Sequence, residues 1–67
     1  MTAMTIKSII ARLDEQTCAT IARTETCLGR RNRATHRNIA ERAATGDTSF
    51  RWALASLIAS GEVVLPC

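Results

Sequence analysis

The sequence predicts one small all-α domain over residues 1–67, built from three or four helices, with or without a short C-terminal strand. Three observations favour this fold class. Apolar residues recur at helical spacing in three segments, capping residues precede these segments, and only the residues just before Pro66 favour an extended strand. Eleven of the 67 residues are alanine, so the core is small, and we expect a partner or self-association to add stability.

The first helical segment is predicted to cover about residues 5–27. Its apolar stripe follows the spacing of an amphipathic helix and comprises Ile6, Ile9, Ile10, Leu13, Ile21 and Leu28. The threonine-rich middle has weak helix propensity, and Asp14 or Thr17 is suited to begin a second helix. The segment is therefore compatible with one helix or two, ending before Gly29. The stripe at 6–28 is also a candidate homodimer interface.

Residues 36–60 are predicted to form a helix-turn-helix unit. Thr35 is the candidate N-cap of its first helix, over residues 36–44. The inner face of this helix would hold Ile39, Ala40 and Ala43, with His36 at the edge. A histidine in that position is more often structural or solvated than catalytic.

The second helix of the unit is predicted to begin after a turn at residues 44–47, with Asp47 or Thr48 as its N-cap. It would run to about Ser60, where Gly61 supplies a left-handed stop. Its apolar stripe comprises Phe50, Ala53, Leu54, Leu57 and Ile58. Residues 62–65 are β-prone, and Pro66 ends them.

Positive charge is concentrated in the middle of the chain. The net charge is +3, and eight of the nine basic residues are arginine, whose planar guanidinium suits phosphate groups. Residues 30–51 carry six of these arginines against two acidic residues. The cluster Arg30, Arg31 and Arg33, with Arg37 close by, is typical of nucleic-acid binding. A solvated loop is the alternative interpretation.

Residues between 39 and 64 follow a recognisable order: Ile39-Ala40-Glu41-Arg42, Phe50-Arg51, Ala53-Leu54, Leu57, Gly61 and Val63-Val64. They resemble the helix-turn-helix core of bacterial winged-helix transcriptional regulators, with the GntR-like group nearest in style. The resemblance implies a DNA-binding protein whose second helix reads the major groove. The chain departs from the pattern at Ala44 and Thr45, where the family has a glycine and an apolar residue, and no complete wing is expected.

The leading hypothesis is therefore a small cytoplasmic DNA-binding transcriptional regulator, a repressor in the manner of this family, acting as a homodimer on double-stranded DNA. The expected phosphate contacts are Arg30, Arg31, Arg33 and Arg37. The resemblance assigns contacts in the groove, by position, to Thr48, Ser49, Arg51 and Trp52.

A protein-binding inhibitor or adaptor, such as those carried by phages, is the alternative from another class. Its contact face would be Trp52, Ala55 and Ala59, because a large aromatic side chain framed by small residues is typical of a protein interface. The same face could instead join two copies of a structural subunit. Trp52 could also pack under the first helix as core.

Several other classes are not supported by the sequence. It has no phosphate-binding glycine loop, no paired carboxylates and a single histidine, so we expect no enzyme, cofactor or metal. The cysteines Cys18, Cys27 and Cys67 share no metal-binding spacing and are interpreted as idle thiols in a reducing compartment. No apolar run is long enough to span a membrane, and residues 1–4 lack the pattern of a signal peptide.

Overall fold

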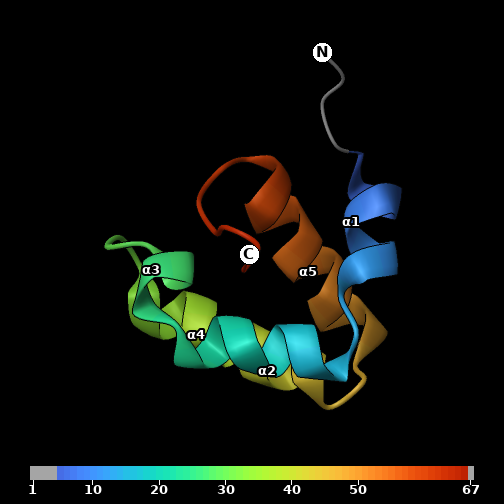
Figure 1. The fold of residues 1–67 in the computed structure, drawn as a ribbon, viewed down its shortest axis with the longest axis horizontal. Helices are drawn as coiled ribbons and strands as arrows, with labels where there is room; N and C mark the ends of the chain where they lie inside the picture. Colours follow the sequence, from blue (N-terminus) through green and yellow to red (C-terminus); the bar gives the residue numbers. More distant parts are fainter. Residues whose placement is uncertain (1–4, 67) are drawn as a thin grey trace.

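The computed structural model describes residues 5–66, which fold into five helices (Figure 1). In chain order these are α1 (Ile6–Arg12), α2 (Glu15–Arg23), α3 (Glu25–Leu28), α4 (Arg33–Ala44) and α5 (Thr48–Ala59). No strand occurs in this part of the chain, so the all-α prediction is confirmed. None of these helices combines the length and apolar character that a membrane span requires.

The N-terminal segment is divided into three helices, which rules out a single helix over residues 5–27. The Asp14 carboxylate accepts a hydrogen bond from the Thr17 backbone N–H at 2.7 Å, and this cap begins α2. At Thr24 the backbone is extended, and this separates α2 from α3. Local hydrogen bonding by polar side chains therefore interrupts the apolar stripe and redirects the chain.

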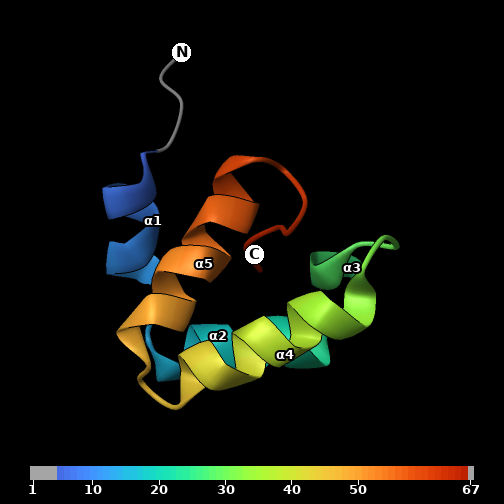
Figure 2. The ribbon, with the colours of Figure 1, turned by 180° about the vertical axis from the view of Figure 1, so that it is seen from behind.

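Two helix pairs, α2 with α4 and α1 with α5, enclose the core. In Figure 1, α2 lies in front of α4, and in Figure 2, seen from behind, α4 and α5 are nearest the viewer with α1 beside α5. The most extensive packing joins α2 to α4, α4 to α5, and α1 to α5. The largest fully buried side chains are Ile9, Leu13, Ile21, Leu28, Leu54, Val63 and Cys18.

The core uses the residues that formed the candidate dimer interface. Ile9, Leu13, Ile21 and Leu28 are each at most 1% exposed within one copy of the chain. The stripe at 6–28 is therefore not available to a second copy, and that part of the prediction is wrong. The homodimer itself stays a prediction that would need another surface.

α4 begins three residues earlier than predicted, so Thr35 lies within its first turn and is not its cap. Asn32 precedes the helix in a left-handed conformation, with φ 56°, and its carbonyl accepts the His36 N–H at 2.9 Å. Asparagine tolerates this conformation better than most residues. No side chain accepts a hydrogen bond from the N–H groups of the first turn, which leaves this helix end electropositive.

The C-terminal segment packs as an irregular tail, and the predicted strand at residues 62–65 does not form. Val63 is buried in the core, and the Val64 N–H donates to the Cys27 carbonyl at 2.9 Å. A Cβ on Gly29 would lie 3.0 Å from the Glu62 carbonyl oxygen, so the tail and the end of α3 are in close contact. Val63 thus packs into the core without a partner strand while Val64 stays exposed, and no first wing strand is present in residues 62–66.

Candidate nucleic-acid interface

α4 and α5 form a helix-turn-helix arrangement, joined by the turn Thr45, Gly46 and Asp47. Asp47 accepts a hydrogen bond from the Phe50 N–H at 3.3 Å, which confirms it as the N-cap of α5. Gly46 has a positive φ of 98°, which a side chain would strain. The turn therefore falls within the predicted residues 44–47, with Ala44 still in α4, and of the two predicted N-caps Asp47 is the one that begins α5.

One face of α5 remains open to solvent. Its exposed residues recur every three or four positions, as one face of a helix requires: Ser49, Trp52, Ser56 and Ala59. We call these four residues the α5 strip. Thr48 is exposed beside its N-terminal end, and Trp52 is 45% exposed. The side chains of the strip are uncharged.

Ala55 does not belong to this surface. It is completely buried, so its predicted place on a contact face with Trp52 and Ala59 is wrong. The reason is geometric, because Ala55 lies about 60° around the helix from Trp52 at 100° per residue, on the side that packs into the protein. Ser56 takes its place beside Trp52 on the exposed surface.

Three predicted DNA-contacting arginines have their guanidinium groups engaged inside the protein. The Arg33 Nε donates to the Gly29 carbonyl at 2.9 Å, the Arg37 Nε to Ala22 at 3.2 Å, and the Arg51 Nε to Ala43 at 2.9 Å. We call them the capping arginines, because each acceptor lies at the C-terminal end of a helix, where carbonyls lack intrahelical partners. They join α3 to α4, α2 to α4, and α4 to α5.

The capping role changes what these residues are available to do. Arg33 also pairs with Glu25 at 3.3 Å, an exposed contact of small energetic value. Arg51 is half-buried against the end of α4 and does not lie on the α5 strip. Its predicted place among the residues that face a groove is therefore not supported by its position.

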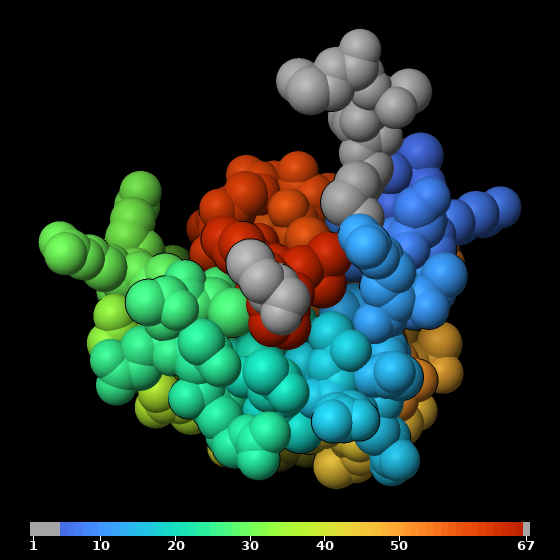
Figure 3. All heavy atoms as spheres, in the orientation of Figure 1, coloured from blue at the N-terminus to red at the C-terminus, as the bar shows by residue number. Residues whose placement is uncertain are grey.

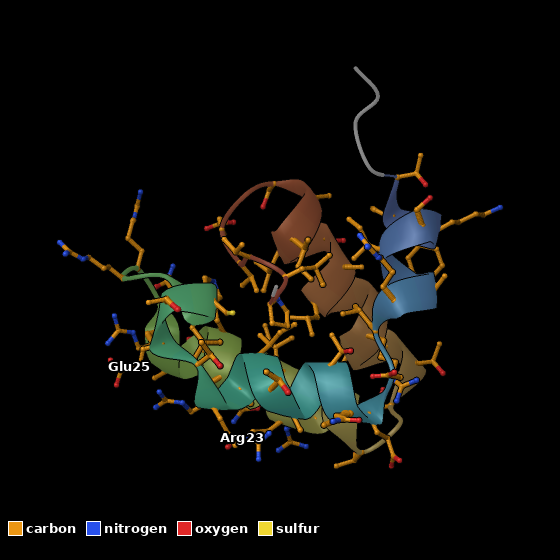
Figure 4. All side chains as sticks on the ribbon, viewed as in Figure 1. Arg23 and Glu25 are labelled. Atoms are coloured by element: carbon orange, nitrogen blue, oxygen red, sulfur yellow. The ribbon has the colours of Figure 1, made fainter. Side chains whose placement is uncertain are left out.

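Arg30 and Arg31 are placed differently. Both are exposed in the loop between α3 and α4, and neither makes a hydrogen bond or an ion pair with any residue from 5 to 66. We call them the loop arginines. The space-filling view shows this loop as a projection at one end of the molecule (Figure 3), and long nitrogen-tipped side chains extend from it in Figure 4. Arg23, labelled there, adds a further exposed positive charge at the end of α2.

The loop arginines lie beside the C-terminal end of α5. Arg30 and Arg31 line the same hollow as Gly61 and Glu62, which follow the C-cap of that helix, Ser60. The basic loop therefore lies near the C-terminal end of α5, in a hollow that no residue of the α5 strip lines.

No family model, curated protein or solved structure matches this chain.

A shallow groove between α4 and α5 was not anticipated from the sequence. It is lined by Ala34, Thr35, Asn38, Ile39 and Phe50. Arg42 covers the Phe50 ring at 5.5 Å from its centroid and donates to the Asn38 side chain at 3.0 Å. The cation over the ring keeps this groove polar at its edge.

His36 is buried, contrary to its predicted place at the helix edge. It is 3% exposed, and its Nδ1 lies 3.0 Å from the Leu28 carbonyl, which can only accept a hydrogen bond. Nδ1 therefore carries a proton in this contact. The spacing of His36 with Ala40 and Ala43, at i, i+4 and i+7, is the signal that places all three on the same buried face.

The described cysteines offer no reactive thiol. Cys18 is completely buried, and its burial raises the pKa of the thiol, which disfavours the nucleophilic thiolate. Cys27 is also buried. Within residues 5–66 no three histidine, cysteine or acidic side chains gather as metal ligands do. Cys67, and any role for it, lies outside the described residues.

Proposed function

We propose that this protein binds double-stranded DNA through α4 and α5, in the manner of a helix-turn-helix protein. The open outer face of α5 is the observation that carries the proposal. α5 would lie in the major groove with the α5 strip toward the bases, and the loop arginines would contact phosphates next to its C-terminal end. Regulation of transcription, and action as a homodimer, are part of the same proposal and follow from the resemblance to winged-helix regulators.

The chemistry of the α5 strip determines what kind of DNA binding is expected. Ser49 and Ser56 can each donate and accept a hydrogen bond at a base edge, and serine does not discriminate strongly among bases. No arginine lies on the strip to contact guanine in the bidentate way that gives most specific contacts. Affinity would therefore come mainly from phosphates, and sequence discrimination would be modest.

The loop arginines supply the decisive test of this proposal. A labelled duplex of mixed sequence is titrated at about 50 mM salt and its anisotropy is followed, with the variant Arg30→Gln/Arg31→Gln compared with the parent. Arg12→Gln is the control, because Arg12 is exposed on α1, lines a hollow with residues of α2, and belongs neither to the α5 strip nor to the α3–α4 loop. We expect the double variant to bind at least about tenfold more weakly and the control to bind like the parent.

The salt dependence adds a second readout to the same titration. Loss of two phosphate contacts should reduce the slope of log K against log salt by about 1.8. Equal affinities and equal slopes for parent and double variant would contradict the proposed interface. The single tryptophan, Trp52, reports on the α5 strip, and its emission should change on binding.

A protein-binding inhibitor or adaptor remains the second candidate function, favoured by one observation. Trp52 is a large aromatic side chain left 45% exposed on an uncharged helix face, as an interface anchor would be. This candidate predicts no affinity for duplex DNA at about 50 mM salt, where phosphate contacts are strongest. It also predicts that Trp52→Ala abolishes binding of the partner while the loop arginine variant retains part of it.

A further inference from the structure

We propose that the hollow between the α3–α4 loop and the end of α5 is a binding site for a phosphate group. It has a volume of about 310 Å³ and is lined by Gly29, Arg30, Arg31, His36, Gly61 and Glu62. We call it the loop pocket. The inference goes beyond the proposed function, since a small phosphate ligand can occupy this pocket whether or not duplex DNA binds α5.

His36 is the first observation that supports the site. Its Nδ1 is engaged with the Leu28 carbonyl, and its Nε2 makes no hydrogen bond with any residue from 5 to 66. No side-chain nitrogen or oxygen of these residues is both fully buried and without a partner. Nε2 must therefore reach solvent, and the loop pocket is the hollow that His36 lines. A side chain that is otherwise buried thus presents one polar atom to the pocket.

That atom is suited to a phosphate group in either protonation state of the ring. When the ring is neutral, the Nδ1 proton occupies the contact with Leu28, so Nε2 accepts a hydrogen bond from a P–OH group. When the ring is protonated, Nε2 donates to a phosphoryl oxygen. In both cases one shared proton lies between the ring and the phosphate.

The charges around the pocket favour an anion. The loop arginines line it and have no partner within the described chain, so both guanidinium groups are available for charge-assisted hydrogen bonds. α4 has twelve residues, and the N–H groups of its first turn lack a side-chain cap, which adds positive potential near the pocket.

Glu62 opposes an anion in the same pocket and provides an internal control. Its carboxylate lies 3.4 Å from the Ser60 hydroxyl, whose one proton is nearer the Leu57 carbonyl at 3.0 Å, and Glu62 is exposed. Removal of this negative charge should tighten phosphate binding, whereas removal of the loop arginines should weaken it. The two substitutions thus change affinity in opposite directions.

The experiment is a titration of the labelled protein with inorganic phosphate, at constant ionic strength set with sodium chloride, followed by amide and imidazole NMR signals. We expect saturable shifts at Gly29, Gly61 and the His36 ring. The Arg30→Gln/Arg31→Gln variant should bind phosphate at least about tenfold more weakly, Glu62→Gln more tightly, and Arg12→Gln like the parent. Non-saturating shifts, shifts spread over the whole protein, or equal affinities for the parent and the double arginine variant would overturn the proposal.

A second titration distinguishes the source of the phosphate. A short single-stranded oligonucleotide is compared with and without a 5′-phosphate, using the same NMR signals. Stronger binding of the phosphorylated form, lost in the double arginine variant, assigns the site to a nucleic-acid terminus. Equal binding of the two forms, with inorganic phosphate still saturating the pocket, assigns it to a free phosphate group.

Discussion

Replacement of the capping arginines by methionine should destabilise the fold, whereas the same change in the loop arginines should not. Methionine retains an apolar stem and removes the guanidinium donor. Arg37 and Arg51 are the two informative sites, because their acceptors differ. The Ala22 carbonyl receives no hydrogen bond other than that of Arg37, whereas the Ala43 carbonyl also accepts the Gly46 N–H at 3.1 Å.

The magnitudes follow from these contacts. A hydrogen bond from a charged donor is worth ~1.5–3 kcal/mol, and both sites are half-buried, which favours the low end of that range. Arg37→Met leaves its carbonyl without a protein partner, so we expect a loss of about 1.5 kcal/mol in the free energy of unfolding. Arg51→Met leaves the Ala43 carbonyl one donor, and a loss of about 0.5–1 kcal/mol is expected.

Thermal and urea unfolding, monitored by far-ultraviolet circular dichroism, measure these differences. For a domain of this size, 1 kcal/mol lowers Tm by roughly 4–8 °C. Arg37→Met should therefore unfold roughly 6–12 °C below the parent, Arg51→Met by less, and Arg31→Met within experimental error of the parent. The reasoning is refuted if Arg37→Met and Arg31→Met have the same Tm, or if Arg51→Met costs more than Arg37→Met.

Three further predictions concern the framework of the site. Gly29→Ala should lower the free energy of unfolding, measured with urea, by at least about 1–2 kcal/mol. Gly29 has φ 77°, and a Cβ there would lie 3.0 Å from the Glu62 carbonyl oxygen. An unchanged urea midpoint would show that the tail moves away freely. The Asp14 pKa is lowered, chiefly by the hydrogen bond from the Thr17 backbone N–H, so its stabilising contribution is present above its unfolded pKa and is lost as pH falls through the folded value. Urea midpoints of the parent and Asp14→Asn should therefore differ at about pH 6 and converge as the pH falls below about 4, and a constant gap would contradict the assignment. Trp52→Ala should change the free energy of unfolding by less than about 1 kcal/mol, because Trp52 is half exposed; a larger loss would identify it as core.

Local signals in the sequence predicted the last helix well. Asp47 as a cap, Gly61 as the left-handed end of α5, and Leu54 on the buried face each depend on a few neighbouring residues. Such patterns are visible in one segment because capping and helical periodicity act over three or four positions. The same logic identified two core residues at the N-terminal end, Ile9 in α1 and Leu13 directly after it.

Tertiary contacts explain what the sequence did not reveal about the site. The bond from Arg37 to Ala22 joins residues fifteen positions apart, so the arginine cluster alone does not separate capping from solvated side chains. Likewise, Ala55 is buried by packing of neighbouring helices, although its small side chain suits an exposed face equally well. Val63 and Val64 favour a strand by propensity, but residues 5–66 offer no partner strand. Val63 is buried in the core instead.

One measurement tests the central claim, that the outer face of α5 binds DNA, most directly. Ser56→Glu places a negative charge on the α5 strip, and Gln16→Glu places the same charge on an exposed position of α2. Both positions lie within helices, where glutamate is well tolerated. The affinity of each variant for the same labelled duplex is compared at about 50 mM salt. The account predicts at least about tenfold weaker binding for Ser56→Glu and parental binding, within about twofold, for Gln16→Glu. Equal affinities for the two variants would contradict it, because the DNA would then lie on a surface other than α5.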